Sequence, residues 1–348
     1  MATPQCQKTI YMHEPITIPG LPLQVKASQL LTLIPIGLLC LSMLSLSPYS
    51  ANAATANPVT ATIDVGPYPD DIAVDPVRNF VYVSVGTAGS GGIFAIDTVT
   101  NAPVFTLFTG AVPNGMAVSP DGQLLYVTTL AGTMDVFSLD LRLFLYSYAT
   151  GSAPSIPAVS RDGSVIYVPN NTDQTVTAFE GQLSPVTMPV SGSPFQVVFS
   201  PDGTHAYVGH TNGFSVIDTS SHTVNDFPLS QGGHEIAITP NGETVYVSSG
   251  GNDVYAIATA TNAVTPISTS APAGTLWGLV LDHTGKRLYV VSATPNAPST
   301  VITIDTQTNS VLNQTTTVGF LSYEIAIKGR TGYTPNLLSD TVSVFKAK

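Results

Sequence analysis

The chain has 348 residues and a formal net charge of −11 at pH 7, because 22 Asp and Glu outnumber 11 Lys and Arg. Nucleic-acid binding depends on Lys and Arg that neutralise phosphates, so this balance argues against a nucleic-acid partner and equally against an anionic membrane surface. Both cysteines, Cys6 and Cys40, lie near the N-terminus, which leaves the rest of the chain without a thiol for catalysis or for a zinc–thiolate site.

The first predicted element is a secretory leader. The apolar run Leu30–Leu46 follows Lys26 and leads into small and polar residues that end in Ala51-Asn52-Ala53. This order is typical of a signal peptide, so residues 1–53 are predicted to be one, with cleavage after Ala53. The alternative is an uncleaved anchor, since the run approaches the ~20 residues that span a bilayer. We expect residues 54–348 to be secreted, periplasmic or at the cell surface, with no membrane contact beyond the leader.

A recurring stretch organises the remainder, and Pro113–Thr129 is its clearest copy. The apolar run Met116–Val118 predicts a short buried strand. Ser119-Pro120-Asp121-Gly122 predicts a turn, because Pro presets φ, Asp bonds to nearby backbone and Gly accepts a positive φ. The β-branched and aromatic residues of Leu124–Thr129 predict a second strand. Each copy therefore encodes a hairpin.

The tyrosine of the second strand recurs at intervals of 39 to 44 residues. It stands at Tyr82, Tyr126, Tyr167, Tyr207, Tyr246, Tyr289 and Tyr333. Repeats of ~40–45 residues with four short strands each are typical of a β-propeller. The sequence predicts an all-β, seven-bladed propeller with four-stranded antiparallel blades. The predicted blades are 67–110, 111–151, 152–192, 193–230, 231–272, 273–318, and 319–348 together with 54–66.

The two ends of this region predict how the ring closes. Pro58–Gly66 has the alternating pattern of a fourth strand, whereas Thr341–Phe345 matches the third strands of other repeats. We therefore expect the N-terminal strand to pair with the C-terminal one and to complete the seventh blade, which removes two exposed sheet edges.

Short motifs in these repeats resemble a known family. Tyr126–Thr129 spells YVTT, SPDG begins at Ser119 and Ser200, and IDT begins at Ile96, Ile217 and Ile304. Over roughly residues 58–348 the chain resembles the YVTN β-propeller repeat family. That family includes surface-layer-type proteins and is similar in fold to the seven-bladed lactonases. The resemblance implies the fold and not an activity.

The candidate site is the rim of the central channel, which the innermost strands line. The two residues before each apolar run crowd this rim, and they include carboxylates, an imidazole, amides and aromatic rings. Such groups together are typical of a small-ligand site. The predicted ligand-binding residues are Asp71, Asn114, Gln196, His234, Glu235, Trp277, Tyr323 and Glu324.

Several uses of this rim remain open. Asp71, Glu235 and Glu324 occupy the same position in their repeats and are candidate ligands for Ca²⁺, to which Asn114 or Gln196 would add oxygens.

A bound cation would polarise a lactone carbonyl while His234 relays a proton, which makes His234 and Glu235 the catalytic candidates. Alternatively, Phe195, Trp277 and Tyr323 would stack on a sugar or a peptide. The remaining alternative is that the rim side chains are solvated or bond to backbone groups at the strand starts.

Recognised catalytic sequence motifs are absent. His234-Glu235 is followed by Ile238 where the HExxH zinc motif needs a second His. The leading hypothesis is an exported, non-enzymatic binding or scaffold protein, monomeric, whose partner is a protein or small molecule at the channel mouth. The alternative is a metal-dependent hydrolase of lactonase type. Ca²⁺ is the one candidate cofactor.

Overall fold

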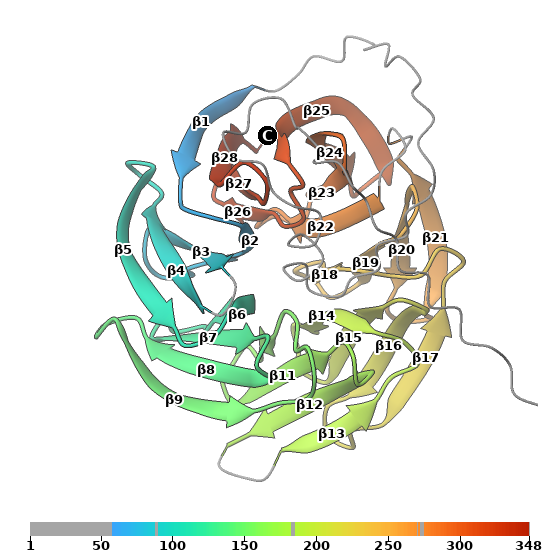
Figure 1. Ribbon diagram of the computed structural model, residues 1–348. Helices are drawn as coiled ribbons and strands as arrows, with labels where there is room; N and C mark the ends of the chain where they lie inside the picture. The colour runs from blue at the N-terminus through green and yellow to red at the C-terminus, as the bar shows by residue number, and fades with distance from the viewer. Residues whose placement is uncertain (1–57, 88–89, 182–184, 270, 272–274, 348) are drawn as a thin grey trace, which may run out of the picture. The chain divides into compact units, whose positions relative to one another are not determined.

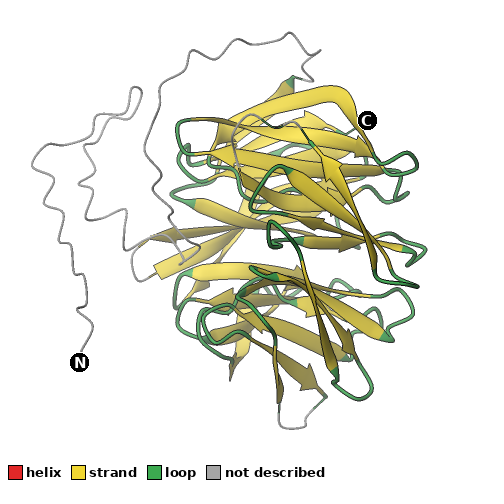
Figure 2. Cartoon of the chain, turned by 90° about the vertical axis from the view of Figure 1, so that its right-hand side faces the viewer, coloured by secondary structure: helices red, strands yellow, loops and turns green. Residues whose placement is uncertain are grey.

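The computed structural model describes residues 58–87, 90–181, 185–269, 271 and 275–347. The predicted signal peptide, residues 1–53, lies outside this range, and its cleavage stays a prediction. Figure 2 shows strands connected by loops. No helix in the described part is long and apolar enough to cross a membrane.

The described strands form seven four-stranded antiparallel sheets, which Figure 1 shows as blades around a common centre. The first three blades are β2 (Pro69–Val74), β3 (Phe80–Thr87), β4 (Ser90–Asp97) and β5 (Ala102–Thr109); β6 (Pro113–Val118), β7 (Leu124–Thr129), β8 (Thr133–Ser138) and β9 (Leu143–Ala149); and β10 (Ala158–Val159), β11 (Val165–Asn170), β12 (Thr175–Glu180) and β13 (Val186–Pro189). The next three are β14 (Pro194–Phe199), β15 (His205–His210), β16 (Gly213–Asp218) and β17 (Val224–Pro228); β18 (Ile236–Ile238), β19 (Thr244–Ser248), β20 (Asp253–Ala258) and β21 (Ala263–Ser268); and β22 (Thr275–Leu281), β23 (Arg287–Thr294), β24 (Ala297–Asp305) and β25 (Ser310–Phe320). The seventh blade is β26 (Ala326–Lys328), β27 (Thr331–Asn336), β28 (Thr341–Lys346) and β1 (Val59–Asp64).

The predicted fold class is confirmed, and so is the assignment of strands to blades. One blade boundary differs: β25 continues to Phe320, two residues past the predicted end of the sixth blade at 318. The recurring turn has the expected chemistry. Ser119 Oγ donates to Asp121 Oδ1 at 2.5 Å and accepts from the Leu124 N–H at 2.9 Å, while Gly122 has φ +71°. The same bonds recur in the third and fourth blades.

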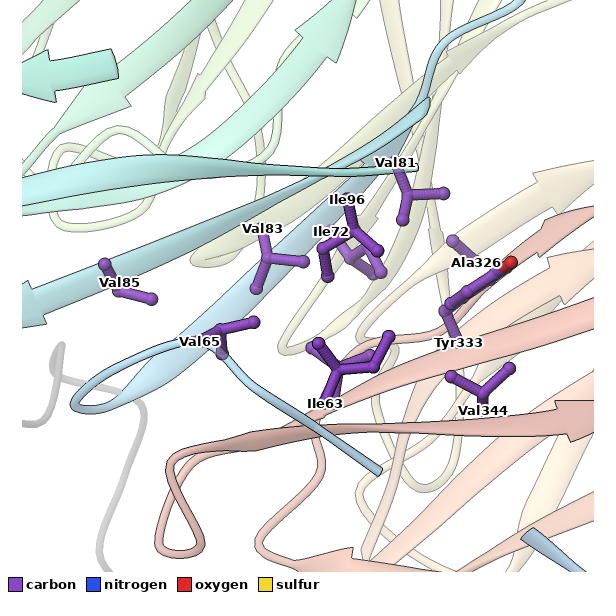
Figure 3. Packing of buried hydrophobic residues seen from close by; sticks show 11 residues of the cluster. Ile63, Val65, Ile72, Val81, Val83, Val85, Ile96, Ala326, Tyr333 and Val344 are labelled. Carbon is purple, nitrogen blue, oxygen red and sulfur yellow. The ribbon is translucent and has the colours of Figure 1, made fainter. Parts of the chain in front are cut away.

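The ring closes as expected, with β1 as the outer strand of the seventh blade. β1 pairs antiparallel with β28, and Ile63 lies opposite Val342. In Figure 1, β1 at the blue end of the colour range lies beside β28 at the red end. Ile63 and Val65 are buried in a cluster with residues of the seventh and first blades, which Figure 3 shows from close by. The N-terminal strand thus covers an edge and adds to the core.

The hydrophobic core is divided among the interfaces between blades. Each of the seven clusters of described residues contains the recurring tyrosine of one blade and apolar residues of the next. Tyr82 shares its cluster with Leu125, Tyr126 with Val168, Tyr167 with Val208, Tyr207 with Val247, Tyr246 with Val290, Tyr289 with Phe345, and Tyr333 with Val83. The last pair joins the seventh blade to the first, so the same interface recurs around the ring.

Tyr246 and Tyr333 also bond to a turn of the next blade. The Tyr246 hydroxyl donates to Asn309 Oδ1 at 2.9 Å, and the Tyr333 hydroxyl donates to Asn101 Oδ1 at 3.4 Å. Both asparagines have a positive φ in the turn between the third and fourth strands. In the fourth blade the corresponding residue is His222, whose ring bonds to Glu180 at 2.8 Å. The buried Tyr167 hydroxyl facing that blade has no hydrogen-bond partner within the described residues.

This difference gives a matched pair of substitutions. Tyr246→Phe removes a satisfied buried hydrogen bond and is expected to lower the free energy of unfolding by about 0.5–1.5 kcal/mol. Tyr167→Phe removes a hydroxyl that is buried without a partner, so it is expected to be neutral or stabilising. Denaturant unfolding of both variants measures the difference. An equal loss in both would show that the bond to Asn309 contributes nothing.

Candidate functional site

The predicted rim residues gather at the start of the innermost strands, where they form two layers. The first residue of each pair is half-buried, and the second residue of five pairs lines a cavity: Asp71, Ile156, Gln196, Glu235 and Glu324. This cavity has a volume of about 420 Å³ and is lined by the innermost strands and the residues leading into them. Asp71, Gln196, Glu235 and Glu324 all line it, so these four predictions converge on one space.

Four rings at the mouth form a continuous arc across the fourth to seventh blades. We call Phe195, His234, Trp277 and Tyr323 the aromatic arc. The His234 ring stacks on Trp277 with centroids 4.4 Å apart and an interplanar angle of 20°. Phe195 meets His234 edge-on at 5.0 Å, and Trp277 meets Tyr323 at 5.0 Å and 65°. All four side chains are half-buried, so each keeps part of its surface open to a ligand.

His234 is held as a neutral ring. Its Nδ1 lies 3.0 Å from the Leu276 carbonyl oxygen, which can only accept, so Nδ1 carries the proton and Nε2 is left as an acceptor. Burial lowers the pKa of His234 below its usual 6.5, and the Leu276 carbonyl acts weakly in the opposite direction. His234 therefore belongs to the arc as an uncharged ring at pH 7.

The second layer is anchored to backbone groups. Gln196 Oε1 accepts the Ile236 N–H at 2.8 Å, and Glu235 Oε2 accepts the Leu279 N–H at 3.0 Å. In both cases a side chain of one blade satisfies the innermost strand of the next. The structure thus shows for Gln196 and Glu235 the backbone bonding that was the alternative to a ligand role.

Asn114 is also occupied by backbone. Its Nδ2 donates to the Pro154 carbonyl oxygen at 2.6 Å, which ties the second blade to the third. One of its two amide N–H donors is therefore used within the fold, and the residue remains half-buried.

Asp71 has one satisfied oxygen and one unsatisfied oxygen. Its side chain is buried, with the residue 3% exposed, and Oδ1 accepts the Ile72 N–H at 2.7 Å. Oδ2 makes no hydrogen bond of normal geometry within the described part of the chain. Burial raises the pKa of Asp71 well above its usual 3.8, and the N–H groups of Ile72 and Met116 act against this rise.

Glu235 and Glu324 meet although a whole blade separates them. Between them the sixth blade carries Gly278, whose lack of a side chain lets the backbone at Tyr323 and Glu324 approach closely, and its N–H donates to the Tyr323 carbonyl oxygen at 2.6 Å. The two carboxyls share a hydrogen bond that raises the pKa of Glu324 and lowers that of Glu235, so Glu324 carries the proton. Burial is the largest cause of the raised pKa of both carboxyls, and the pKa of Glu235 rises to about 7.

Sequence reasoning gave too little weight to two residues. Asp70 is not among the predicted site residues, yet burial raises its pKa to about 6, and its charge adds to the burial that raises the pKa of Tyr323. Gly278 is not among the predicted site residues either, yet it lets the backbone of the seventh blade approach the sixth. A glycine at a rim position where other copies carry a side chain was the available signal.

No three or more His, Cys, Asp or Glu side chains in the described ranges are grouped so that they could hold a metal ion. Asp71, Glu235 and Glu324 line one cavity without forming such a group, so the Ca²⁺ site stays a prediction without geometric support. His234 and Glu235, the catalytic candidates, bond to different partners: Leu276 for the ring, and Leu279 with Glu324 for the carboxyl.

The raised carboxyl pKa values predict a stability that increases as the pH falls from about 8 to 6.5. In this range the folded protein binds protons at Glu235 and Asp70 that the unfolded chain, with pKa values near 4.5 and 3.8, does not bind. Asp71 and Glu324 act in the same direction. Below 6.5 the lowered pKa values of His210 and His234 oppose the trend.

Melting temperatures across this range test the expectation. Glu235→Gln should flatten the dependence, whereas Glu243→Gln on the exposed surface should leave it unchanged. A wild-type protein that is equally stable at both ends of the range would contradict the proton uptake.

Gly278→Ala is expected to destabilise the protein by about 1–3 kcal/mol through overpacking. A Cβ at this position would lie 2.5 Å from the Tyr323 carbonyl oxygen and 2.8 Å from Glu324 Cα. Gly110→Ala is the control, because a Cβ there meets nothing within 4 Å. Denaturant unfolding distinguishes the two, and equal stability of both variants would contradict the close approach of the sixth and seventh blades.

Neither a protein-family model nor a curated protein matches the chain. Solved structures do: a chain of the hydrazine synthase of Kuenenia stuttgartiensis is similar with a TM-score of 0.72 and 20% identity, over 82% of this chain and 97% of that one. The β-propeller domain of Cps50 (Swd1) of Myceliophteria thermophila also has a TM-score of 0.72, with 10% identity, over 83% of this chain and 100% of that one. At these identities the similarity concerns the fold alone. The chain is a seven-bladed β-propeller, WD40-like in architecture.

Proposed function

We propose that this protein is an exported, non-enzymatic β-propeller that binds a ligand at the mouth of its channel, at the cell envelope or outside the cell. The observation that carries the proposal is the aromatic arc. Four rings from four successive blades are half-buried, and the residues that follow three of them, Gln196, Glu235 and Glu324, line a cavity of about 420 Å³. This volume lies within the ~300–1,000 Å³ of typical small-molecule sites.

The ring architecture supports a binding role. Closure through β1 and the repeated interfaces between blades hold Phe195 and Trp277 on strands and His234 and Tyr323 in the segments that lead into strands, so the arc is preorganised and loses little freedom when a ligand binds. The predicted leader and the low content of charged residues support export. The resemblance of the repeats to the YVTN family, which includes surface-layer-type proteins, supports a place at the cell envelope.

The partners of the catalytic candidates favour binding over hydrolysis. A proton relay needs His234 and Glu235 within hydrogen-bond reach of each other or of a shared water. Instead the ring nitrogen bonds to Leu276, and the carboxyl bonds to Leu279 and Glu324. Both side chains thereby stabilise the rim.

Trp277 is the only tryptophan of the chain, so its fluorescence reports on the candidate site. The experiment titrates the purified protein with tri-N-acetylchitotriose, trialanine and n-pentylamine. At least one is expected to change the fluorescence saturably. Phe195→Ala is expected to lower the affinity for that ligand about tenfold or more, as for an aromatic contact at the centre of a site.

Phe108→Ala is the matched control, because Phe108 is 82% exposed on β5, away from the mouth. Equal affinity of the Phe195 and Phe108 variants would place binding elsewhere. Hydrolysis of δ-valerolactone that is lost in Glu235→Gln would replace the proposal with the lactonase alternative.

A further inference from the structure

The cavity combines an acidic end with apolar walls. Asp71, Glu235 and Glu324 lie near the starts of their strands, with Gln196 among them. Farther along the same strands the lining is aliphatic and includes Val74, Val118, Val198, Val280 and Ile327. We call the three carboxyl residues the acid ring. No described residue that lines the cavity carries a positive charge.

The described lining offers this ring no positive charge, and the proton shared by Glu235 and Glu324 offsets its negative charge only in part. Asp71 is 3% exposed and lines the cavity, and its Oδ2 makes no hydrogen bond of normal geometry within the described residues, although the Met116 N–H lowers the pKa of this carboxyl. Glu235 is also 3% exposed, and Glu324 relieves it only by sharing a proton. A buried carboxylate without a partner is unfavourable, so a cation in the cavity would relieve a penalty that the fold alone leaves in place.

The layout favours an organic cation over a metal ion. Ca²⁺ takes 6–8 oxygen ligands at about 2.3–2.6 Å, and the acid ring spreads its carboxyls over the first, fifth and seventh blades. An ammonium group carries three N–H donors that can reach separate carboxyl oxygens, and an attached methylene chain gains by burial against aliphatic walls. The arc at the mouth is compatible with the same ligand, because aromatic faces attract ammonium groups.

We propose that the channel binds an aliphatic primary ammonium ion, with its charged end among Asp71, Glu235 and Glu324 and its methylene chain along the valines of the wall. This inference rests on the binding function proposed above and gives it a ligand class. The ammonium group has two plausible sources, a free linear amine or the lysine side chain of a peptide, and the experiment separates them.

The test measures binding of n-pentylamine to the purified protein by calorimetry and by Trp277 fluorescence. The uncharged 1-pentanol has the same chain and serves as the reference ligand. n-Pentylamine is expected to bind saturably and to raise the melting temperature, whereas 1-pentanol does neither at the same concentration. Nα-acetyl-lysine methylamide forms the second arm: tighter binding than n-pentylamine identifies a lysine side chain as the source, and weaker binding identifies a free amine.

Three variants assign the binding to the acid ring and the wall. Asp71→Asn keeps the shape of the side chain and its bond to Ile72 but removes the charge. This variant is expected to have an affinity for n-pentylamine that is about tenfold lower or more. Asp64→Asn makes the same change of net charge on the exposed face of β1 and should leave the affinity unchanged. Val198→Phe fills the aliphatic part of the cavity, so it should lower the affinity for n-pentylamine and leave the affinity for methylamine unchanged.

Several results would overturn the inference. n-Pentylamine that binds no better than 1-pentanol, together with no binding of the lysine derivative, would remove the ammonium site. Equal affinities of the Asp71 and Asp64 variants for n-pentylamine would show that the ammonium group binds outside the acid ring. CaCl₂ could instead raise the melting temperature, with the rise abolished by Asp71→Asn and no effect of amines. That result would favour a metal site over an ammonium site. If tri-N-acetylchitotriose binds and the amines do not, the ligand class fails while the binding function stands.

Discussion

The packing of one tyrosine per blade against the next blade is the interaction on which the structure depends. A four-stranded sheet has two faces and cannot bury both by itself, so each blade needs a neighbour on either side. The recurring tyrosine supplies the large apolar surface at each interface, from Tyr82 facing the second blade to Tyr333 facing the first. Since the same tyrosine packing stabilises every interface between blades, the ring needs neither a disulfide nor a central core. Its axis can therefore contain a cavity.

The fold could be predicted because it is written as a repeat. Seven tyrosines at similar spacing gave the number of blades, and the fourth-strand pattern of Pro58–Gly66 gave the closure that β1 and β28 confirm. The rim could be predicted in part, because a fixed position before each innermost strand places Asp71, Gln196 and Glu235 in one cavity. What spacing along the chain could not show is distance across the axis. The bond between Glu235 and Glu324 joins the fifth blade to the seventh, and the partners of His234 and Asn114 are backbone groups that carry no sequence signal.

The channel mouth shows a conflict between stability and ligand recognition. The interfaces between blades are satisfied almost throughout, whereas the acid ring keeps buried carboxyls whose pKa values are raised by burial and by one another. Sites that break the rules of stable packing without a structural gain are the expected places for function. The aromatic arc and the acid ring together form such a place, and their separation into two layers gives a ligand an apolar entrance and a charged interior.

Closure by β1 also constrains the order of events when the protein is made. Thr60 Oγ1 donates to the Val344 carbonyl oxygen, a contact between residues 284 positions apart. Six blades consist of consecutive strands and can form as the chain emerges, but the strand that is synthesised earliest must wait for the most C-terminal strand of the ring. Contacts this distant in sequence form slowly, because a long loop has to close first. Until then the nascent propeller has an unpaired edge, and this interval is when a chaperone or a protease has access to it.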